Sequence, residues 1–173
     1  YISVTGVQTC ALPIWAIASY FVLRSKGEVD NFFILADALA PGLLIAQAIG
    51  RFGNWFNGEL FGRPTKLPWG LEIPPTLRPI QFMQDNTFHP TFTYEAIWSL
   101  IIAFMLLRIK SKRSGEIFWL YVAGYSIGRI GIESIRTDYA HLILGIRLNV
   151  WVAILCTGLG VWQYLKLKRQ PIG

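Results

Sequence analysis

Apolar residues in this sequence gather in five runs, which polar or glycine- and proline-containing stretches separate. The runs cover residues 15–23, 32–49, 92–107, 117–132 and 148–165. Apolar runs of nearly this length are typical of transmembrane helices. The pattern therefore predicts an all-α integral membrane protein with about five transmembrane helices, the first of them partial. Because several runs are shorter than about 20 residues, we expect tilted helices or polar first turns.

The stretch between the second and third runs has a different character. Most of the nine prolines of the chain lie within residues 63–90, and proline disfavours both helix interiors and central strands. We expect short strands or turns here, in a proline-rich periplasmic segment on the membrane surface. Trp69, Phe82 and Phe88 are candidates to anchor this segment at the level of the lipid headgroups.

Composition supports a membrane protein and weakens the case for other classes. Of the 173 residues, 53% are hydrophobic and 15% are charged, whereas soluble domains usually contain about 25% charged residues. Basic residues cluster at 24–26, 108–113 and 166–169, directly after the first, third and fifth runs. Such clusters favour the cytoplasmic side, so we expect alternating helices and a cytoplasmic C-terminus. The net charge of +6 does not indicate nucleic acid as a partner, because no basic-aromatic recognition module accompanies it.

Residues 50–62, directly after the second run, combine four glycines with Arg51, Asn54, Asn57 and Glu59. Ionisable groups near a bilayer are costly unless they pair, line a cavity or bind a polar ligand. Glycine lets the backbone approach a ligand closely and adopt positive φ where a turn needs it. The segment therefore predicts a polar site at the membrane surface that binds an anion.

A second polar set lies in and after the fourth run. Tyr125, Arg129, Glu133 and Arg136 follow i, i+4, i+8 and i+11 spacing, which places them on one face of a helix. Three glycines in the same run permit another helix to approach closely. Arginines that face a common cavity suit a phosphate group, whose oxygens accept bidentate hydrogen bonds.

A structural interpretation stands beside the functional one for each polar set. Arg129 and Glu133 belong either to a binding site or to an intrahelical ion pair, and Arg51 with Glu59 has the same two interpretations. Asp37 in the second run is expected to cap a helix or to pair within the bundle.

The start of the third run contains further candidate residues. His89 is a candidate proton carrier, although a lone histidine is more often structural. Thr91 or Thr93 is expected to cap the helix, with Glu95 at the positive end of its dipole. The sequence contains no nucleophile elbow, phosphate-binding loop or paired-histidine metal motif, so those enzyme classes are disfavoured.

These motifs resemble the signature of the prolipoprotein diacylglyceryl transferases, which are bacterial inner-membrane enzymes. The likeness is most specific at residues 50–62, where Trp55 replaces the usual phenylalanine. Further likeness lies at residues 37–42, 67–70 and 89–95 and in the set Tyr125, Arg129 and Glu133. The resemblance therefore extends from residue 15 to the C-terminus.

The resemblance implies transfer of the diacylglyceryl group of phosphatidylglycerol to the lipobox cysteine thiol of preprolipoproteins. A thioether forms and glycerol 1-phosphate is released, with no metal or cofactor. The implied partners are phosphatidylglycerol, the signal-peptide region of preprolipoproteins and membrane lipids. The implied catalytic residues are Arg51, Glu59, Tyr125, Arg129 and Glu133. The implied substrate-binding residues are Asn54, Asn57, Gly50, Gly53, Gly62, Arg136 and His89.

The sequence also departs from this family. The family carries earlier transmembrane helices and an HGG-type histidine motif, and no segment here matches that motif. Either His89 substitutes for that motif, or the chain is an N-terminally truncated, inactive copy. The transferase domain is expected to span residues 15–173. Residues 1–14 resemble translated sequencing-adapter sequence and are expected to be an artefact or a disordered lead-in.

Two other function classes stay open. One is a non-catalytic membrane protein that binds anionic lipid through the same arginines. The other is a small transporter with an anion site at the membrane midplane.

Overall fold

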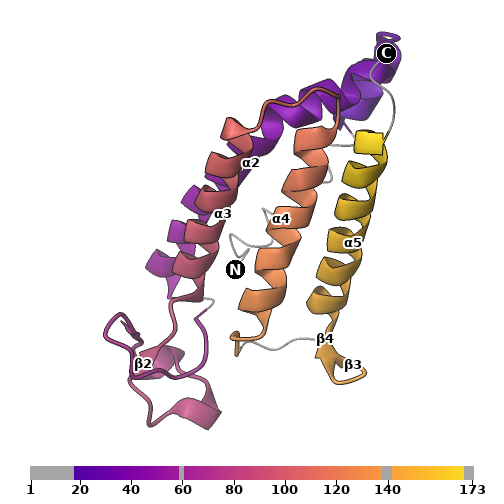
Figure 1. Ribbon diagram of the computed structural model, residues 1–173. Helices are drawn as coiled ribbons and strands as arrows, with labels where there is room; N and C mark the ends of the chain where they lie inside the picture. The colour runs from indigo at the N-terminus through magenta and orange to yellow at the C-terminus, as the bar shows by residue number, and fades with distance from the viewer. Residues whose placement is uncertain (1–17, 59–60, 138–141, 170–173) are drawn as a thin grey trace.

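The computed structural model describes residues 18–58, 61–137 and 142–169, which form a bundle of long helices (Figure 1). Residues 18–25 are helical, and a short 3-10 helix, η1 (Val29–Asn31), follows them. The long helices are α2 (Phe32–Asn57), α3 (Thr91–Arg108), α4 (Glu116–Glu133) and α5 (Leu148–Arg169). They coincide with the second to fifth apolar runs, and the expected mainly helical protein is confirmed.

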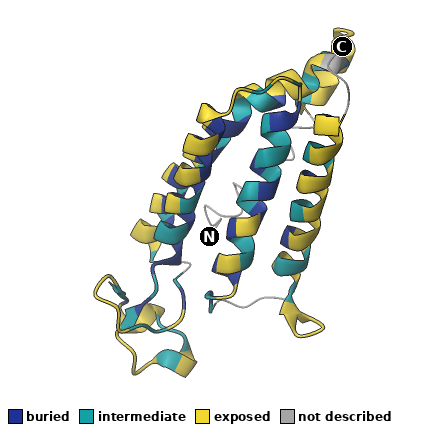
Figure 2. Ribbon diagram, viewed as in Figure 1, coloured by how far each residue is buried: buried dark blue, intermediate teal, exposed yellow. Residues whose placement is uncertain are grey.

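Three described helices, α2, α3 and α5, are long and apolar enough to cross a membrane. The 18 residues of α4 are outside this set, because they include Glu116, Arg129 and Glu133. Figure 2 shows exposed residues along the outer faces of the helices, and many of these are large and hydrophobic. Outward apolar faces suit a hydrocarbon solvent, so the chain is a membrane protein. The number of five spans stays a prediction.

α2 continues about two turns beyond the apolar run that predicts it. It ends at Gly58, whose φ of 63° lies in the left-handed region that favours glycine as a helix C-cap. Residues 50–57, which follow the apolar run in the sequence, therefore belong to the helix. As a result Arg51 and Asn54 lie on the inner face of a helix, where they are 5% and 1% exposed.

Small residues bring the helices close together. A buried cluster joins α2, α3 and α4 and consists of Ala40, Leu44, Ile102, Ala103, Leu106 and Tyr121. The indole of Trp98 lies where a Cβ on Gly128 would be, and its Nε1 donates to the carbonyl of Gly124 at 2.9 Å. The expected close approach is thus confirmed at these two glycines. A Cβ on Gly131 would meet no described atom within 4 Å.

The segment between α2 and α3 contains short strands and turns, as its prolines predict. Strand β1 (Leu71–Glu72) pairs antiparallel with β2 (Thr87–Phe88). Two 3-10 turns, η2 (Pro75–Leu77) and η3 (Ile80–Phe82), lie between these strands. The expectation that Phe88 anchors the segment at the lipid headgroups is wrong, because Phe88 is fully buried against Phe61 and Phe82.

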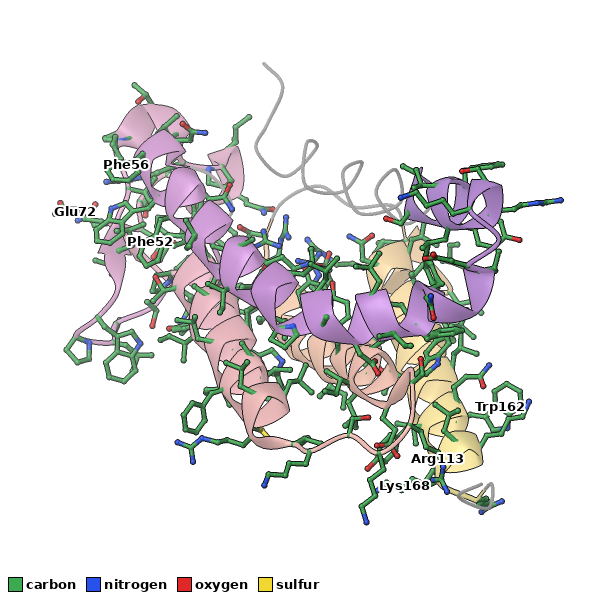
Figure 3. The ribbon with its side chains drawn as sticks, turned by 90° about the horizontal axis from the view of Figure 1, so that it is seen from above. Phe52, Phe56, Glu72, Arg113, Trp162 and Lys168 are labelled. Atoms are coloured by element: carbon green, nitrogen blue, oxygen red, sulfur yellow. The ribbon has the colours of Figure 1, made fainter. Side chains whose placement is uncertain are left out.

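The two ends of the bundle differ. The α3–α4 connection and the end of α5 lie at one end (Figure 1). The segment between α2 and α3 lies at the other, together with the hairpin of β3 (Leu142–Ile143) and β4 (Ile146–Arg147). Arg113 and Lys168 lie near the end of α5 (Figure 3). The basic clusters after the third and fifth runs therefore share one end, as a common membrane side requires.

Candidate functional site

Six charged side chains meet where α2, α3, α4 and the start of α5 approach one another. They are Arg51, Glu95, Arg129, Glu133, Arg136 and Arg147. We call this set the arginine–glutamate cluster. Its members come from α2, α3, α4, the turn after α4 and strand β4, which lie far apart in the sequence. Folding of the chain therefore brings them together.

Glu95, in the second turn of α3, joins α2 to α4. Its Oε2 lies 2.5 Å from Arg51 Nη2, and its Oε1 accepts a hydrogen bond of 3.1 Å from Arg129 Nη1. Arg136 Nη1 lies 3.9 Å from the same Oε1. Because Glu95 is only 4% exposed, these guanidinium groups offset its charge in place of water.

Glu133, the last residue of α4, forms a second centre. Its Oε2 accepts a hydrogen bond of 3.3 Å from Arg129 Nη2. Its Oε1 accepts hydrogen bonds of 3.1 Å from Arg147 Nη1 and 3.0 Å from Asn149 Nδ2. Arg136 Nη1 lies 3.9 Å from Oε2. Arg129 and Arg136 thus contact both carboxylates and unite the two centres.

Four guanidinium groups meet in the cluster, and each is ion-paired with Glu95 or Glu133. Arg51 Nη1 is nevertheless buried without a hydrogen-bond partner among the described residues. The side chain of Arg129 is 20% exposed, so part of the cluster is accessible. A phosphate group would supply an acceptor for Arg51 Nη1, and its oxygens match the forked geometry of arginine.

Asp37 fixes the position of α4 along the axis of α2. Its Oδ2 accepts a hydrogen bond from the backbone N–H of Gly115 and its Oδ1 from that of Phe118, both at 2.7 Å. The carboxylate thereby caps the N-terminus of α4, and the expected capping role of Asp37 is confirmed. Arg51 follows Asp37 by 14 residues, and Arg129 follows Gly115 by 14 residues. Because both helices rise by the same distance per residue, the two arginines lie at the same level, where both contact Glu95.

Arg136 differs from the expected single helical stripe, whereas Tyr125, Arg129 and Glu133 share one face of α4. α4 ends at Glu133, and Arg136 reaches the cluster from the following turn, where it forms a bridge with Gly62. The Tyr125 ring stacks on Tyr121 with centroids 6.1 Å apart and packs against the apolar core. Tyr125 therefore lies one turn from Arg129, on the core side of the cluster.

Gly62 serves close packing in this region. Its backbone N–H donates to the carbonyl of His89 at 2.8 Å. A Cβ on Gly62 would lie 2.8 Å from Thr91 Cγ2 and 3.0 Å from Ile135 Cγ2. The absence of a side chain thus lets the segment that carries Arg136 approach the start of α3.

His89 lies beside an apolar groove and is not one of the described members of the arginine–glutamate cluster. Its Nδ1 is 3.1 Å from Tyr94 Oη, which accepts a hydrogen bond of 2.9 Å from Trp69 Nε1. Tyr94 and Trp69 also form part of the wall of a groove of about 510 Å³. Other residues of its wall are Trp55, Phe92, Thr93 and Ile97. Such a groove suits a hydrocarbon segment.

The other predicted site residues have varied positions. Asn57 is exposed at the end of α2, and Gly50 and Gly53 are half-buried within that helix. Glu59 lies outside the described residues, as do residues 1–14. The predicted pairing of Glu59 with Arg51 therefore stays a prediction, and the carboxylate seen beside Arg51 belongs to Glu95.

Sequence reasoning missed Glu95, Arg147 and Asn149 as members of the site. It assigns Glu95 to the dipole of α3 and the cap to a threonine, whereas Pro90 occupies the N-cap position. Two signals point to the missed residues. Glu95 is an ionisable residue at the start of an apolar run, and Arg147 is a positive charge on the membrane side where few are expected.

Comparison with known proteins gives concordant results. A family model described as prolipoprotein diacylglyceryl transferase matches residues 11–166. A protein of Cutibacterium acnes named phosphatidylglycerol–prolipoprotein diacylglyceryl transferase is 49% identical over 167 residues, which cover 94% of this chain and 56% of the relative.

Relatives of the same name occur in Streptomyces griseus subsp. griseus and Acaryochloris marina. They are 53% and 46% identical over 165 and 159 residues. These alignments cover 93% and 87% of this chain, and 49% and 57% of the relatives. The chain thus spans about half the length of the curated relatives it matches.

Proposed function

The chain belongs to the prolipoprotein diacylglyceryl transferase family, and we propose that it takes part in the reaction for which its relatives are named. The diacylglyceryl group of phosphatidylglycerol passes to the lipobox cysteine of a preprolipoprotein. The thiolate sulfur attacks a glyceryl carbon, because the thiolate is the nucleophilic form of cysteine. The bond from that carbon to the phosphate oxygen breaks, a thioether forms, and glycerol 1-phosphate leaves.

The observation that carries this proposal is the convergence of guanidinium groups in the arginine–glutamate cluster, where Arg51 Nη1 has no hydrogen-bond partner among the described residues. The phosphodiester of the substrate has one negative charge, whereas a phosphate monoester carries about −1.5 to −2 at neutral pH. Negative charge therefore grows on the phosphate as the bond breaks. Guanidinium groups held in fixed positions beside the phosphate stabilise the transition state more than the ground state. We assign the phosphate to Arg51 and Arg129, with Arg136 beside them, while Glu95 and Glu133 hold these side chains in position.

A lipid substrate presents a charged headgroup next to hydrocarbon, and the molecule offers a surface for each. The cluster suits the headgroup, and the groove beside Trp55 and Tyr94 suits an apolar chain. In this proposal Asn54 and Asn57 bind headgroup oxygens, and Tyr125 and His89 contribute to the surrounding walls. The signal-peptide region of the preprolipoprotein and membrane lipids are the other partners.

The proposed location is the inner membrane of a bacterium, with the C-terminus in the cytoplasm. The basic clusters of residues 108–113 and 166–169 support this orientation. Arg51 and Arg129 lie toward the C-terminal ends of α2 and α4, away from these basic clusters. In this orientation the site opens toward the periplasmic half of the membrane.

Release of glycerol 1-phosphate tests the proposal. The purified chain is mixed with phosphatidylglycerol and a lipobox peptide, and a matched peptide with serine in place of cysteine is the control. A second sample carries the N-terminal part of the Cutibacterium acnes relative fused to this chain. Product from the fused sample supports the transferase, and product from both places the chemistry within this chain. Lipid binding without product from either folded sample favours the non-catalytic, lipid-binding alternative.

A further inference from the structure

One face of α2 carries a line of buried polar atoms beside the arginine–glutamate cluster. Gln47, Arg51 and Asn54 follow i, i+4 and i+7 spacing, so their side chains leave the helix on the same side. Gln47 Oε1, Arg51 Nη1 and Asn54 Oδ1 are buried and have no hydrogen-bond partner among the described residues. The three Cα atoms are separated along the helix axis by about 6 Å and about 4.5 Å.

Buried polar atoms without partners are rare in folded proteins, because losing water without a replacement is costly. Three such atoms on one helix face indicate a place where a ligand supplies the partners. A fourth buried atom without an aligned hydrogen bond, Glu95 Oε2, lies 2.5 Å from Arg51 Nη2 and is therefore offset by that charge.

The order of these atoms along α2 is acceptor, donor, acceptor. Arg51 Nη1 donates only, which suits a phosphate oxygen. The amide oxygens of Gln47 and Asn54 accept only, so they require an O–H or N–H group of the ligand. An ammonium headgroup would bring a positive charge beside the Arg51 guanidinium, which is unfavourable. A neutral hydroxyl group meets the requirement without that repulsion.

We propose that Gln47 and Asn54 recognise the hydroxyl groups of a polyol headgroup whose phosphate binds Arg51. This inference rests on the proposed function, since phosphatidylglycerol carries two headgroup hydroxyls, and it adds Gln47 to the site. The Gln47 amide is oriented by Nε2, which donates to Tyr121 Oη at 3.3 Å. That bond leaves Oε1 for the ligand. The site therefore distinguishes headgroups by their hydroxyls as well as by charge.

Competition between two lipids tests this proposal. The purified chain in detergent is offered equal amounts of phosphatidylglycerol and phosphatidylpropanol, which has the same phosphate but no headgroup hydroxyls. Mass spectrometry of the protein–lipid complexes gives the ratio of the two bound lipids. We expect the unaltered chain to prefer phosphatidylglycerol by roughly tenfold, as two net hydrogen bonds imply. Gln47→Leu and Asn54→Leu should each reduce this ratio about threefold.

Two matched variants separate hydroxyl recognition from general damage. Gln81→Leu makes the same substitution at an exposed position outside the site, so the ratio should stay unchanged. Gln47→Glu keeps acceptor oxygens while adding negative charge, so both lipids should bind more weakly at an unchanged ratio. Circular dichroism verifies that each variant is folded.

Three outcomes would overturn the proposal. The first is that the unaltered chain binds the two lipids equally. The second is that both leucine variants keep the same preference for phosphatidylglycerol as the unaltered chain. The third is that neither lipid binds more than phosphatidylcholine does. A tenfold preference without glycerol 1-phosphate release from either transferase sample has a different meaning. It would support recognition of the hydroxyls and contradict only the proposed transferase activity.

Discussion

Arginine at positions 51 and 129 does more than supply charge. Arg129 places one guanidinium nitrogen against Glu95 and another against Glu133, so a single planar group spans two carboxylates. Arg51 places Nη2 against Glu95 and leaves Nη1 for another partner. A lysine ammonium cannot reproduce either arrangement, because its donors radiate from one atom.

Arg51→Lys separates geometry from charge. The variant is made in the chain alone or in the fusion with the Cutibacterium acnes segment, whichever releases glycerol 1-phosphate. We expect the rate of release to fall roughly 100-fold, comparable to loss of one preorganised donor at a developing anion. Arg63→Lys is the matched control, because Arg63 is exposed, and it should change the rate less than about twofold. A wild-type rate from Arg51→Lys would mean that Arg51 does not grip the phosphate.

Glu133→Gln tests whether the arginines depend on their carboxylates. The glutamine leaves Arg129 and Arg147 near a neutral amide, and breaking a buried ion pair typically costs about 3–5 kcal/mol. We expect a clearly lower midpoint of thermal unfolding in detergent, followed by circular dichroism. Glu72→Gln, at an exposed position, should leave the midpoint almost unchanged. Equal midpoints for the two variants would show that the Glu133 charge is dispensable for stability.

At the scale of elements, α4 is positioned at three levels. Asp37 caps its start, Trp98 packs on Gly128 in its middle part, and Arg147 and Asn149 hold Glu133 at its end. These contacts come from three other helices or their flanking turns. The geometry of the site therefore depends on helix packing more than on the sequence of α4 itself.

Two glycines of α4 provide a matched test of this packing. Gly128→Ala places a methyl group in the space of the Trp98 ring, and such overpacking typically costs about 1–3 kcal/mol. Gly131→Ala meets no described atom within 4 Å, and alanine stabilises a helix interior by about 0.5–1 kcal/mol relative to glycine. We expect opposite shifts of the unfolding midpoint in a detergent titration. Shifts of the same sign would contradict the assigned α3–α4 contact.

The helices could be predicted from sequence because apolar runs report burial in lipid directly. The end of α2 could not, since Gly50, Gly53 and Gly58 resemble helix breakers. Contacts with other helices, such as that of Arg51 with Glu95, can override this low helix propensity. Spacing identified the pair Arg129 and Glu133 because both lie on one helix. It could not identify partners on other helices, whose positions follow from packing.

At the scale of the whole molecule, charge divides the bundle along its length. Basic clusters occupy the end with the α3–α4 connection and the end of α5 (Figures 1 and 3). The arginine–glutamate cluster lies toward the other end, where its members come from α2, α3, α4, the turn after α4 and strand β4. The two groups of positive charge therefore have different partners. The basic clusters suit the membrane surface, whereas the arginines of the arginine–glutamate cluster pair with carboxylates.

Cysteine labelling tests the proposed orientation. In a chain with Cys10→Ala and Cys156→Ala, single cysteines replace Asp85 in the segment between α2 and α3 or Lys112 in the α3–α4 connection. We expect a membrane-impermeant maleimide to label Asp85→Cys in cells with a permeable outer layer and an intact inner membrane. Lys112→Cys should react only after that membrane is opened. The reverse pattern would place the C-terminus outside.

The meeting of four guanidinium groups in one cluster also bears on the stability of this protein. Like charges held at short distance repel one another, and Arg51 Nη1 is buried without a hydrogen-bond partner among the described residues. An anionic lipid that bound only the folded chain would stabilise it by mass action, by about 2.7 kcal/mol at a hundredfold excess over its Kd. Anionic lipid would then be a structural component of the protein, and its depletion from the membrane would lower the free energy of unfolding.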